Sequence, residues 1–132
     1  MKKLILLLSF LILLTGCTSG GGYQVTNAIG ETSTPGMLAM TYDNFNGTKF
    51  GDFYPVAPGE TVEFLVNVET LDGSLTIYVT PESDENMIVY KAEDIQTSEF
   101  SFIIDDPGEY ALYLSADDHK GGYSIQVTRS MN

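Results

Sequence analysis

The stretch TVEFLVNVET, residues 61–70, decides the fold class of this chain. Apolar side chains stand at every second position from Val62 to Val68, and polar ones from Glu63 to Glu69 lie between them. Only Leu65 interrupts the polar series. A side-chain period of two with one polar face is typical of a half-buried antiparallel β-strand.

The same pattern continues on both sides of this stretch. Alternation recurs at 74–80, 99–104 and 122–128, and shorter apolar segments lie at 37–42, 50–56, 87–91 and 110–115. No apolar pattern of helical period is long enough to indicate a helix. The chain from Met37 onward therefore predicts a series of short strands.

Turn-forming residues separate these segments. Asn46-Gly47 and Asp72-Gly73 favour tight hairpins, and His119-Lys120-Gly121-Gly122 is expected to close a last hairpin. Ala57–Glu60 and Asp106–Glu109 place Pro before Gly, as type II turns require.

These features together predict an all-β fold, a single antiparallel β-sandwich of jelly-roll or Greek-key type with about seven or eight strands. The exception is an acidic loop at 81–86, followed by a potential helical turn at Ala92–Ile95.

The N-terminus carries a targeting signal. Lys2 and Lys3 precede the apolar run 4–14, which is shorter than the roughly 20 residues of a membrane-spanning helix. Leu14-Thr15-Gly16-Cys17 follows and resembles the cleavage box of bacterial lipoproteins. The resemblance implies cleavage before Cys17 and lipidation of that cysteine. The alternative is an uncut membrane anchor with an incidental cysteine.

Three regions result from this interpretation. Residues 1–16 are a signal peptide, 17–36 are the lipidated cysteine and a flexible linker with a potential short strand at 23–26, and 37–132 are the sandwich. Two acyl chains attach a protein stably to a membrane. Since Thr18 is not Asp, the lipoprotein resemblance implies the outer membrane of a two-membrane envelope, or otherwise the outer leaflet of the cell membrane.

Composition narrows the choice of partners. The net charge is −12, and signal cleavage would remove two lysines and no acid. A surface this acidic argues against nucleic acid and against electrostatic docking on anionic lipid. Cys17 is the only cysteine, so the chain has neither a disulfide framework nor a cysteine metal site.

Several short motifs resemble the PPC (pre-peptidase C-terminal) domains of bacteria and the GOLD-type sandwich. They are the aromatic and Val before Pro58-Gly59-Glu60, the Gly-x-Leu-x-Ile-x-Val strand from Gly73, Phe-x-Phe before Pro107-Gly108-x-Tyr-x-Leu, and the closing Gly-x-Tyr-x-Ile-x-Val from Gly121. The resemblance implies a sandwich with a non-catalytic accessory, binding or interaction role.

Catalytic and metal-binding patterns are weak. The single His119 lies near Ser115 and Asp117, but no Gly-x-Ser-x-Gly elbow accompanies it, so we expect a turn residue and no enzyme. The paired acids Asp105, Asp106, Asp117 and Asp118 are calcium candidates if two loops meet at one end of the sandwich. Solvated loop acids are the alternative.

Bulky side chains at outward positions are more informative. Alternation places Tyr78 and Tyr113 on the polar side of their strands, as it does Leu65 and Ile103. If these four share a face, they form a patch for a sugar or a protein partner. The alternative is burial of both faces, beneath the loop 82–94 or the N-terminal segment.

The sequence thus predicts a membrane-anchored extracytoplasmic lipoprotein acting as a non-enzymatic binding module at the cell envelope, with a protein or glycan ligand. A scaffolding lipoprotein, or an accessory that captures ligands for a transporter or secreted enzyme, is the alternative.

Overall fold

Three long strands dominate the computed structural model, which describes residues 22–132. The strands are β1 (Tyr23–Thr26), β2 (Ile29–Thr34), β3 (Met37–Val56), β4 (Glu60–Pro81), β5 (Tyr90–Ala92), β6 (Ser98–Ile104) and β7 (Gly108–Met131). Every pairing is antiparallel, in the order β1-β3-β7-β4-β5, with β2 also on β3 and β6 also on β4. The predicted all-β sandwich is confirmed.

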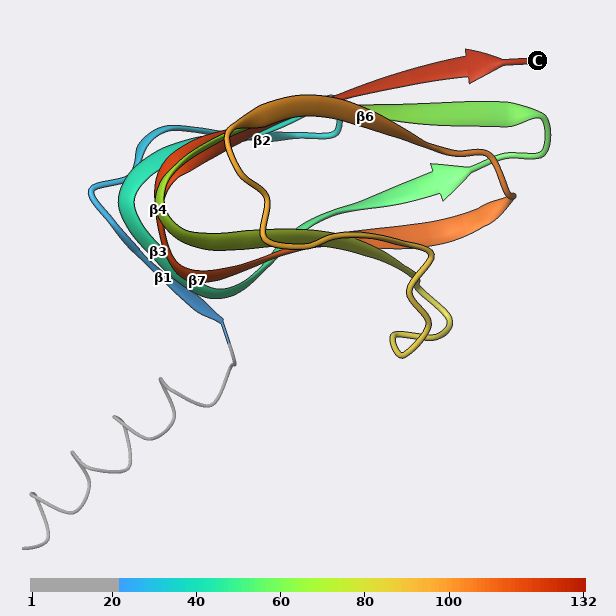
Figure 1. The fold of residues 1–132 in the computed structure, drawn as a ribbon. Coiled ribbons are helices and arrows are strands. Elements are labelled where there is room, and N and C mark those ends of the chain that lie inside the picture. Colours follow the sequence, from blue (N-terminus) through green and yellow to red (C-terminus); the bar gives the residue numbers. More distant parts are fainter. Residues whose placement is uncertain (1–21) are drawn as a thin grey trace, which may run out of the picture.

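The long strands each run through both layers of the sandwich (Figure 1). A straight strand of 20 residues would span roughly 66 Å, far longer than a domain of this size. The strands instead bend together, and one continuous sheet folds back over itself. The first layer holds β2, β6 and residues 37–42, 60–70 and 121–131, and the second holds β5 and residues 48–56, 74–81 and 108–116.

The bend corrects three predicted hairpins. The strands do not reverse at Asn46-Gly47, Asp72-Gly73 or His119–Gly122, because β3, β4 and β7 pair with one another on both sides of these positions. Register shifts mark the bend, and Gly73 and Gly121 adopt positive φ there. A Cβ at Gly121 would overlap the carbonyl oxygen of Glu69. The glycines therefore let neighbouring backbones approach while each strand turns a corner.

True reversals lie at the opposite end and connect the layers. Between β3 and β4, the amide of Glu60 donates to the carbonyl of Ala57 at 2.9 Å, as predicted for a turn. Between β6 and β7, the Tyr110 hydroxyl donates to the Asp106 carbonyl at 2.7 Å. Gly108 there has φ 153° and already belongs to β7, so the second reversal is not the predicted type II turn.

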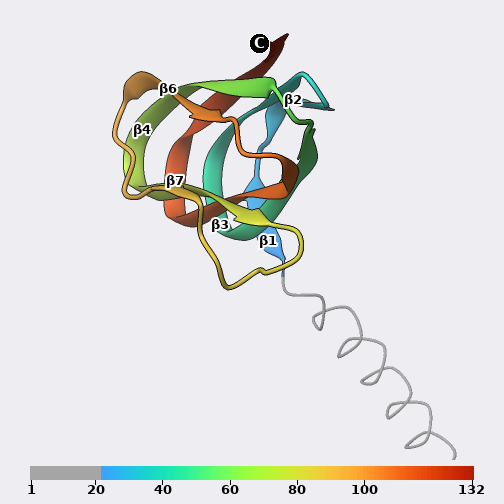
Figure 2. The same ribbon diagram turned by 90° about the vertical axis from the view of Figure 1, so that its right-hand side faces the viewer.

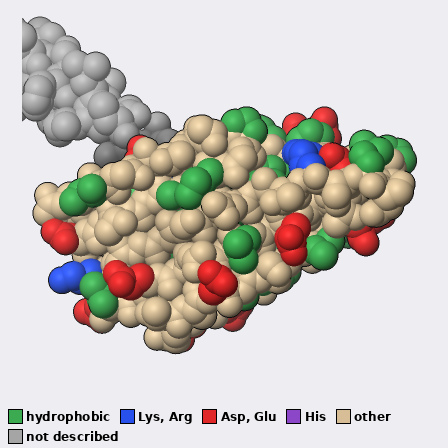
Figure 3. Space-filling model, turned by 90° about the horizontal axis from the view of Figure 1, so that it is seen from above, with side chains coloured by type: hydrophobic (Ala, Val, Ile, Leu, Met, Phe, Trp, Pro, Cys, Tyr) green, Lys and Arg blue, Asp and Glu red, His purple; other side chains and the backbone are tan. Residues whose placement is uncertain are grey.

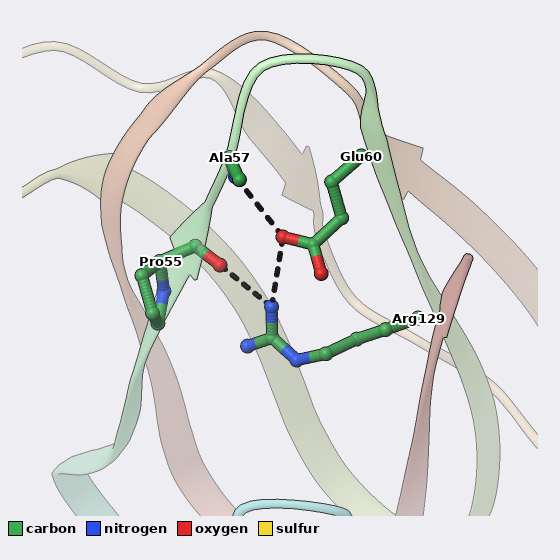
Figure 4. A network of polar contacts seen from close by, with 4 residues as sticks. All are labelled: Pro55, Ala57, Glu60 and Arg129. Carbon is green, nitrogen blue, oxygen red and sulfur yellow. Dashed lines mark hydrogen bonds and ion pairs between the residues drawn. The ribbon is translucent and has the colours of Figure 1, made fainter. Parts of the chain in front are cut away.

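An ion pair fastens this end (Figure 4). The Arg129 guanidinium donates to the Pro55 carbonyl at 2.6 Å and contacts the Glu60 carboxylate at 3.2 Å. The same carboxylate accepts from the Ala57 amide at 3.0 Å. That amide, and secondarily Arg129, lowers the pKa of Glu60 below its usual range. The contacts tie the ends of β3, β4 and β7 together.

The N-terminal segment is not the flexible linker that the sequence predicts, because it contains two strands. The potential strand at 23–26 is confirmed as β1, but Ile29–Thr34 is also a strand, so the sheet begins before the predicted boundary at Met37. Val25 packs on the core, and the Tyr23 ring meets the buried Phe45 ring edge-on at 5.8 Å. β2 is exposed throughout, so main-chain pairing with β3 holds it in place. Lys49 lies 5.5 Å from the Tyr23 ring and 4.0 Å from Glu31.

The segment between β4 and β6 also differs from expectation. Residues 82–89 project from the body on the side of the second layer (Figures 1 and 2). Of the predicted strand at 87–91, only Tyr90 and Lys91 pair with β4, in a short strand that continues to Ala92. The helical turn predicted at Ala92–Ile95 does not form. Asp94 has positive φ, and the amide of Ile95 donates to the Leu75 carbonyl at 2.8 Å, which buries Ile95 beside the core.

The core lies between the layers and follows the predicted alternation. Val62, Phe64 and Val66 are fully buried, as are Leu75, Ile77 and Val79. Aromatic rings cross the core, with Phe64 stacked on Phe102 at 4.7 Å. Within residues 22–132, no helix has the length and apolarity to cross a membrane.

Candidate ligand-binding face

The outer face of the second layer carries a row of aromatic side chains. Phe50, Tyr113 and Tyr78 are direct partners across β3, β7 and β4. Tyr113 stacks on Tyr78 with ring centroids 5.2 Å apart and meets Phe50 edge-on at 5.7 Å. Their neighbours Ile77 and Leu112 are fully buried, so alternation directs the row outward. This arrangement is a continuous apolar surface across three strands.

Phe53 joins the row because β3 contains a bulge. Positions 50 and 53 of a regular strand would face opposite sides, but the register of β3 against β7 shifts between Phe50 and Asp52. Both rings therefore lie on the outer face, 4.7 Å apart, and are 41% and 51% exposed. Tyr54, the next residue along β3, is buried. We call Phe50, Phe53, Tyr78 and Tyr113 the aromatic strip.

A groove of about 510 Å³ adjoins the strip at Tyr78. It lies between the outer face of the second layer and the projecting loop 82–89. We call it the Tyr78 groove, and its lining residues are Thr76, Tyr78, Glu85, Asn86, Ile88, Lys91, Glu93 and Ser115. Tyr78 therefore belongs to both the strip and the groove.

The local register explains why these side chains meet. Lys91 of β5 is the direct partner of Tyr78, and Ser115 of β7 is the direct partner of Thr76. Each pair points outward on adjacent strands. Asn86 is held in the loop by a hydrogen bond from its backbone amide to the Asp84 carboxylate at 3.0 Å. Strand pairing thus builds the floor of the groove, and the loop builds its wall.

Charges in the groove are mixed with an excess of acid. The Lys91 ammonium lies 2.6 Å from the Glu93 carboxylate. Burial raises the pKa of Tyr78 above its ordinary value, and Tyr113 and Glu85 raise it further, against a smaller opposite effect of Lys91. The Tyr78 hydroxyl is therefore protonated at neutral pH and can donate a hydrogen bond.

The four predicted outward residues do not share one face. Tyr78 and Tyr113 lie together on the second layer, whereas Leu65 and Ile103 belong to the first. The bend in β4 separates them, since it carries residues 60–70 and 74–81 into different layers. On the first layer, Glu63 pairs directly with Ile103, and hydrophobic side chains are mostly separated by others (Figure 3).

His119 is not the exposed turn residue that we expected. It is fully buried at the bend, where Nδ1 lies 2.6 Å from the Tyr42 hydroxyl and Nε2 2.8 Å from Thr70 Oγ1. Thr70 Oγ1 donates its hydrogen to the Ile95 carbonyl at 2.7 Å, so it must accept from Nε2–H. Burial lowers the pKa of His119, which makes the imidazole neutral. Both ring nitrogens are thus hydrogen-bonded to buried or half-buried hydroxyls, which indicates a structural role for His119.

The calcium candidates are not brought together. Asp105 and Asp106 lie at the β6–β7 reversal, while Asp117 and Asp118 lie at the bend (Figure 1). The amide of Asp118 donates to Asn46 at 3.2 Å. Among residues 22–132, no group of three or more His, Cys, Asp or Glu side chains is placed to hold a metal ion. The predicted lipidation site, Cys17, lies outside the described residues.

Sequence reasoning missed Phe50, Phe53 and the charged lining of the groove. One signal was available for Phe53, because an isolated glycine within a strand pattern, here Gly51, often marks a bulge. Glu85 and Lys91 carried no comparable signal. Glu85 reaches the groove through the path of the loop, and Lys91 through the pairing of β5 with β4, and strand periodicity describes neither.

Neither a protein-family model nor a curated protein sequence matches this chain. Similar solved structures include the pre-peptidase C-terminal domain of a Bacillus anthracis collagenase, with 19% identity over 79% of this chain and 90% of that one and a TM-score of 0.46. A CBM4 structure is 12% identical over 89% and 83%, with a TM-score of 0.49. A carbohydrate binding module from Cellvibrio mixtus lichenase 5A, in complex with cellotriose, is 12% identical over 83% and 87%, with a TM-score of 0.42. At these values the matches assign neither a family nor a function.

Proposed function

We propose that this chain is a non-enzymatic binding module that holds a neutral glycan in the Tyr78 groove. The observation that supports it is the composition of the groove. The Tyr78 ring and Ile88 offer apolar surface, and the remaining lining side chains donate or accept hydrogen bonds. A sugar ring likewise has an apolar face and a rim of hydroxyls, so the two surfaces are complementary.

Electrostatics favours a neutral sugar over an acidic one. Glu85 and Glu93 outnumber Lys91 in the groove, and Lys91 is already paired with Glu93. The whole chain carries a net charge of −12. A uronic acid or sulfated sugar would approach against this field.

The test is a glycan array with the full chain purified in detergent, followed by titration calorimetry with the neutral glycans that bind. Tyr78→Ala should weaken binding about tenfold or more, since it removes the ring shared by groove and strip. If no neutral glycan binds at millimolar concentration, or if Tyr78→Ala binds as tightly as the natural chain, the proposal fails.

A protein ligand is the second candidate, and one observation favours it. Met87, Ile88 and Val89 are consecutive, apolar and about half exposed at the projecting loop beside the groove. Crosslinking in cells followed by mass spectrometry would detect such a partner, and would also reveal the scaffolding role or the accessory ligand-capture role. A crosslinked peptide from 82–89 that disappears in an Ile88→Ser variant would support the protein ligand.

Anchoring to the cell envelope is a separate part of the proposal and rests on the sequence alone. Lipidated Cys17 would hold the sandwich at the cell membrane or the outer membrane. Metabolic labelling with an alkynyl fatty acid should mark the natural chain and not Cys17→Ala. Equal labelling of both would refute the anchor without affecting the proposed glycan site.

A further inference from the structure

The aromatic strip leads away from the Tyr78 groove across the second layer. Tyr78, Tyr113 and Phe50 are neighbours in register, so the strip spans three strands, which lie about 4.8 Å apart. The ring centroids follow one another at 5.2, 5.7 and 4.7 Å from Tyr78 to Phe53. The apolar surface is therefore an elongated band that runs across the strands and begins at the groove.

The bulge in β3 is the feature that extends this band. Gly51 is buried at the bulge, and a Cβ there would lie 2.9 Å from both Leu112 Cδ2 and Leu38 Cδ1. A glycine at this position lets the Leu112 and Leu38 side chains pack closely, and the shift in register keeps Phe53 outside. A strand without the bulge would direct that ring toward the opposite face. The half-exposed pair Phe50 and Phe53 is consequently a product of local backbone structure.

The two ends of the band differ in chemistry. At the Tyr78 end, hydroxyls, carboxylates and an ammonium surround the ring and can fix the orientation of a polar ligand. At the Phe53 end, Phe50 and Phe53 present apolar surface with a large exposed fraction. A ligand that fills only the groove leaves this second end in water. A longer ligand covers it.

We propose that the ligand is an extended neutral oligosaccharide, whose chain runs from the Tyr78 groove across Tyr113 and Phe50 to Phe53. This inference rests on the proposed glycan-binding function and deepens it. The groove sets the specificity for the first sugar, and the strip adds affinity for each further residue that reaches it. Affinity therefore increases with chain length until the chain reaches Phe53.

The test is calorimetry of the full chain in detergent with neutral β-linked gluco-oligosaccharides, from the disaccharide to the hexasaccharide. The hexasaccharide should bind about tenfold more tightly than the disaccharide. Phe53→Ala should lower the affinity for the hexasaccharide roughly three- to tenfold and leave the affinity for the disaccharide unchanged. Ile103→Ala is the matched control, because Ile103 is 56% exposed on the other layer, and it should change neither affinity.

The outcomes separate this inference from the function on which it rests. Equal affinity for short and long chains, or equal behaviour of Phe53→Ala and Ile103→Ala, overturns the extended site while disaccharide binding sustains the groove. If the natural chain binds no oligosaccharide of this series, the extended site is refuted, and if no neutral glycan on the array binds either, the proposed function is refuted with it. Sedimentation of the same variants provides a further check. A concentration-dependent dimer that Phe53→Ala abolishes would identify the strip as a contact between copies and overturn the inference.

Discussion

The two outer faces of the sandwich are built by the same three strands, yet they differ in what they present to solvent. On the first layer, Leu65 faces Ser101 and Gln126, and Ile103 faces Glu63. On the second, aromatic residues are direct partners of one another, and a groove adjoins them. An exposed apolar residue with polar neighbours is ordinary, whereas a contiguous band indicates a binding surface.

The comparison shows that exposure of a single side chain says little about function. Ile103 is slightly more exposed than Phe53, but its direct strand partner is the acidic Glu63 and not another aromatic ring. What distinguishes the second layer is register, because strand pairing lines up Phe50, Tyr113 and Tyr78. The bend creates this difference, because it carries each long strand from one face to the other.

Replacement of Gly121 should have the largest effect. Gly121→Ala places a Cβ against the Glu69 carbonyl oxygen at a backbone φ of 136°, so the bend of β7 could not persist unchanged. We expect a loss of about 3 kcal/mol in the free energy of unfolding, measured by urea denaturation. Gly36→Ala is the control, since nothing lies within 4 Å of its added Cβ, and it should change stability by less than about 0.5 kcal/mol. Equal stability of the two variants would contradict the role of the bend.

Most strands and core residues could be predicted from the sequence, but the bend could not. Alternation identified Val62, Phe64 and Val66 as core residues, because a half-buried strand imposes a period of two. A glycine after Asn or Asp marks positive φ equally in a hairpin and at a corner. Pairing across the corner distinguishes the two, and pairing is a long-range property. Gly73 therefore predicted the right backbone conformation and the wrong topology.

Paired substitutions on the two faces should give the next largest effect. Tyr78→Ala and Leu65→Ala each remove a half-buried outward side chain, so each should reduce the free energy of unfolding by about 1 kcal/mol. Only Tyr78→Ala should also weaken glycan binding, about tenfold or more by calorimetry. Similar binding losses in both variants would mean that the faces do not differ. A stability loss above about 3 kcal/mol in Tyr78→Ala would place the ring in the core.

The candidate site was predictable in part. Tyr78 and Tyr113 emerged from alternation, because bulky residues on a polar face are unexpected. The condition that they share a face with Leu65 and Ile103 is not met, since alternation assigns a side of the strand and not a layer. The groove depends on where loop 82–89 returns to the sheet, and no residue spacing encodes that path.

Acidification should reduce the free energy of unfolding by a smaller amount, through His119 at the bend. The pKa of buried His119 lies below its ordinary value of 6.5, so the unfolded chain binds a proton more readily than the folded one. The resulting stability is fully present above pH 6.5 and is lost as the pH falls toward the folded pKa. One proton gives a slope of at most about 1.4 kcal/mol per pH unit. Urea denaturation from pH 7 to pH 5 should show this slope, and His119→Gln should flatten it. An unchanged slope in that variant would assign the effect to other groups.

Calcium should have the smallest effect. A site shared by the acid pairs would need Asp105 and Asp106 beside Asp117 and Asp118, but the pairs lie at the reversal and at the bend. Two carboxylates alone fall short of the six to eight oxygens that calcium takes. The melting temperature in millimolar calcium should therefore equal that in chelator, since a ligand stabilises a fold only in proportion to its binding. A shift of several degrees would contradict this expectation. An additional Asp105→Asn variant would then show whether the reversal binds the ion, and an Asp117→Asn variant would show whether the bend does.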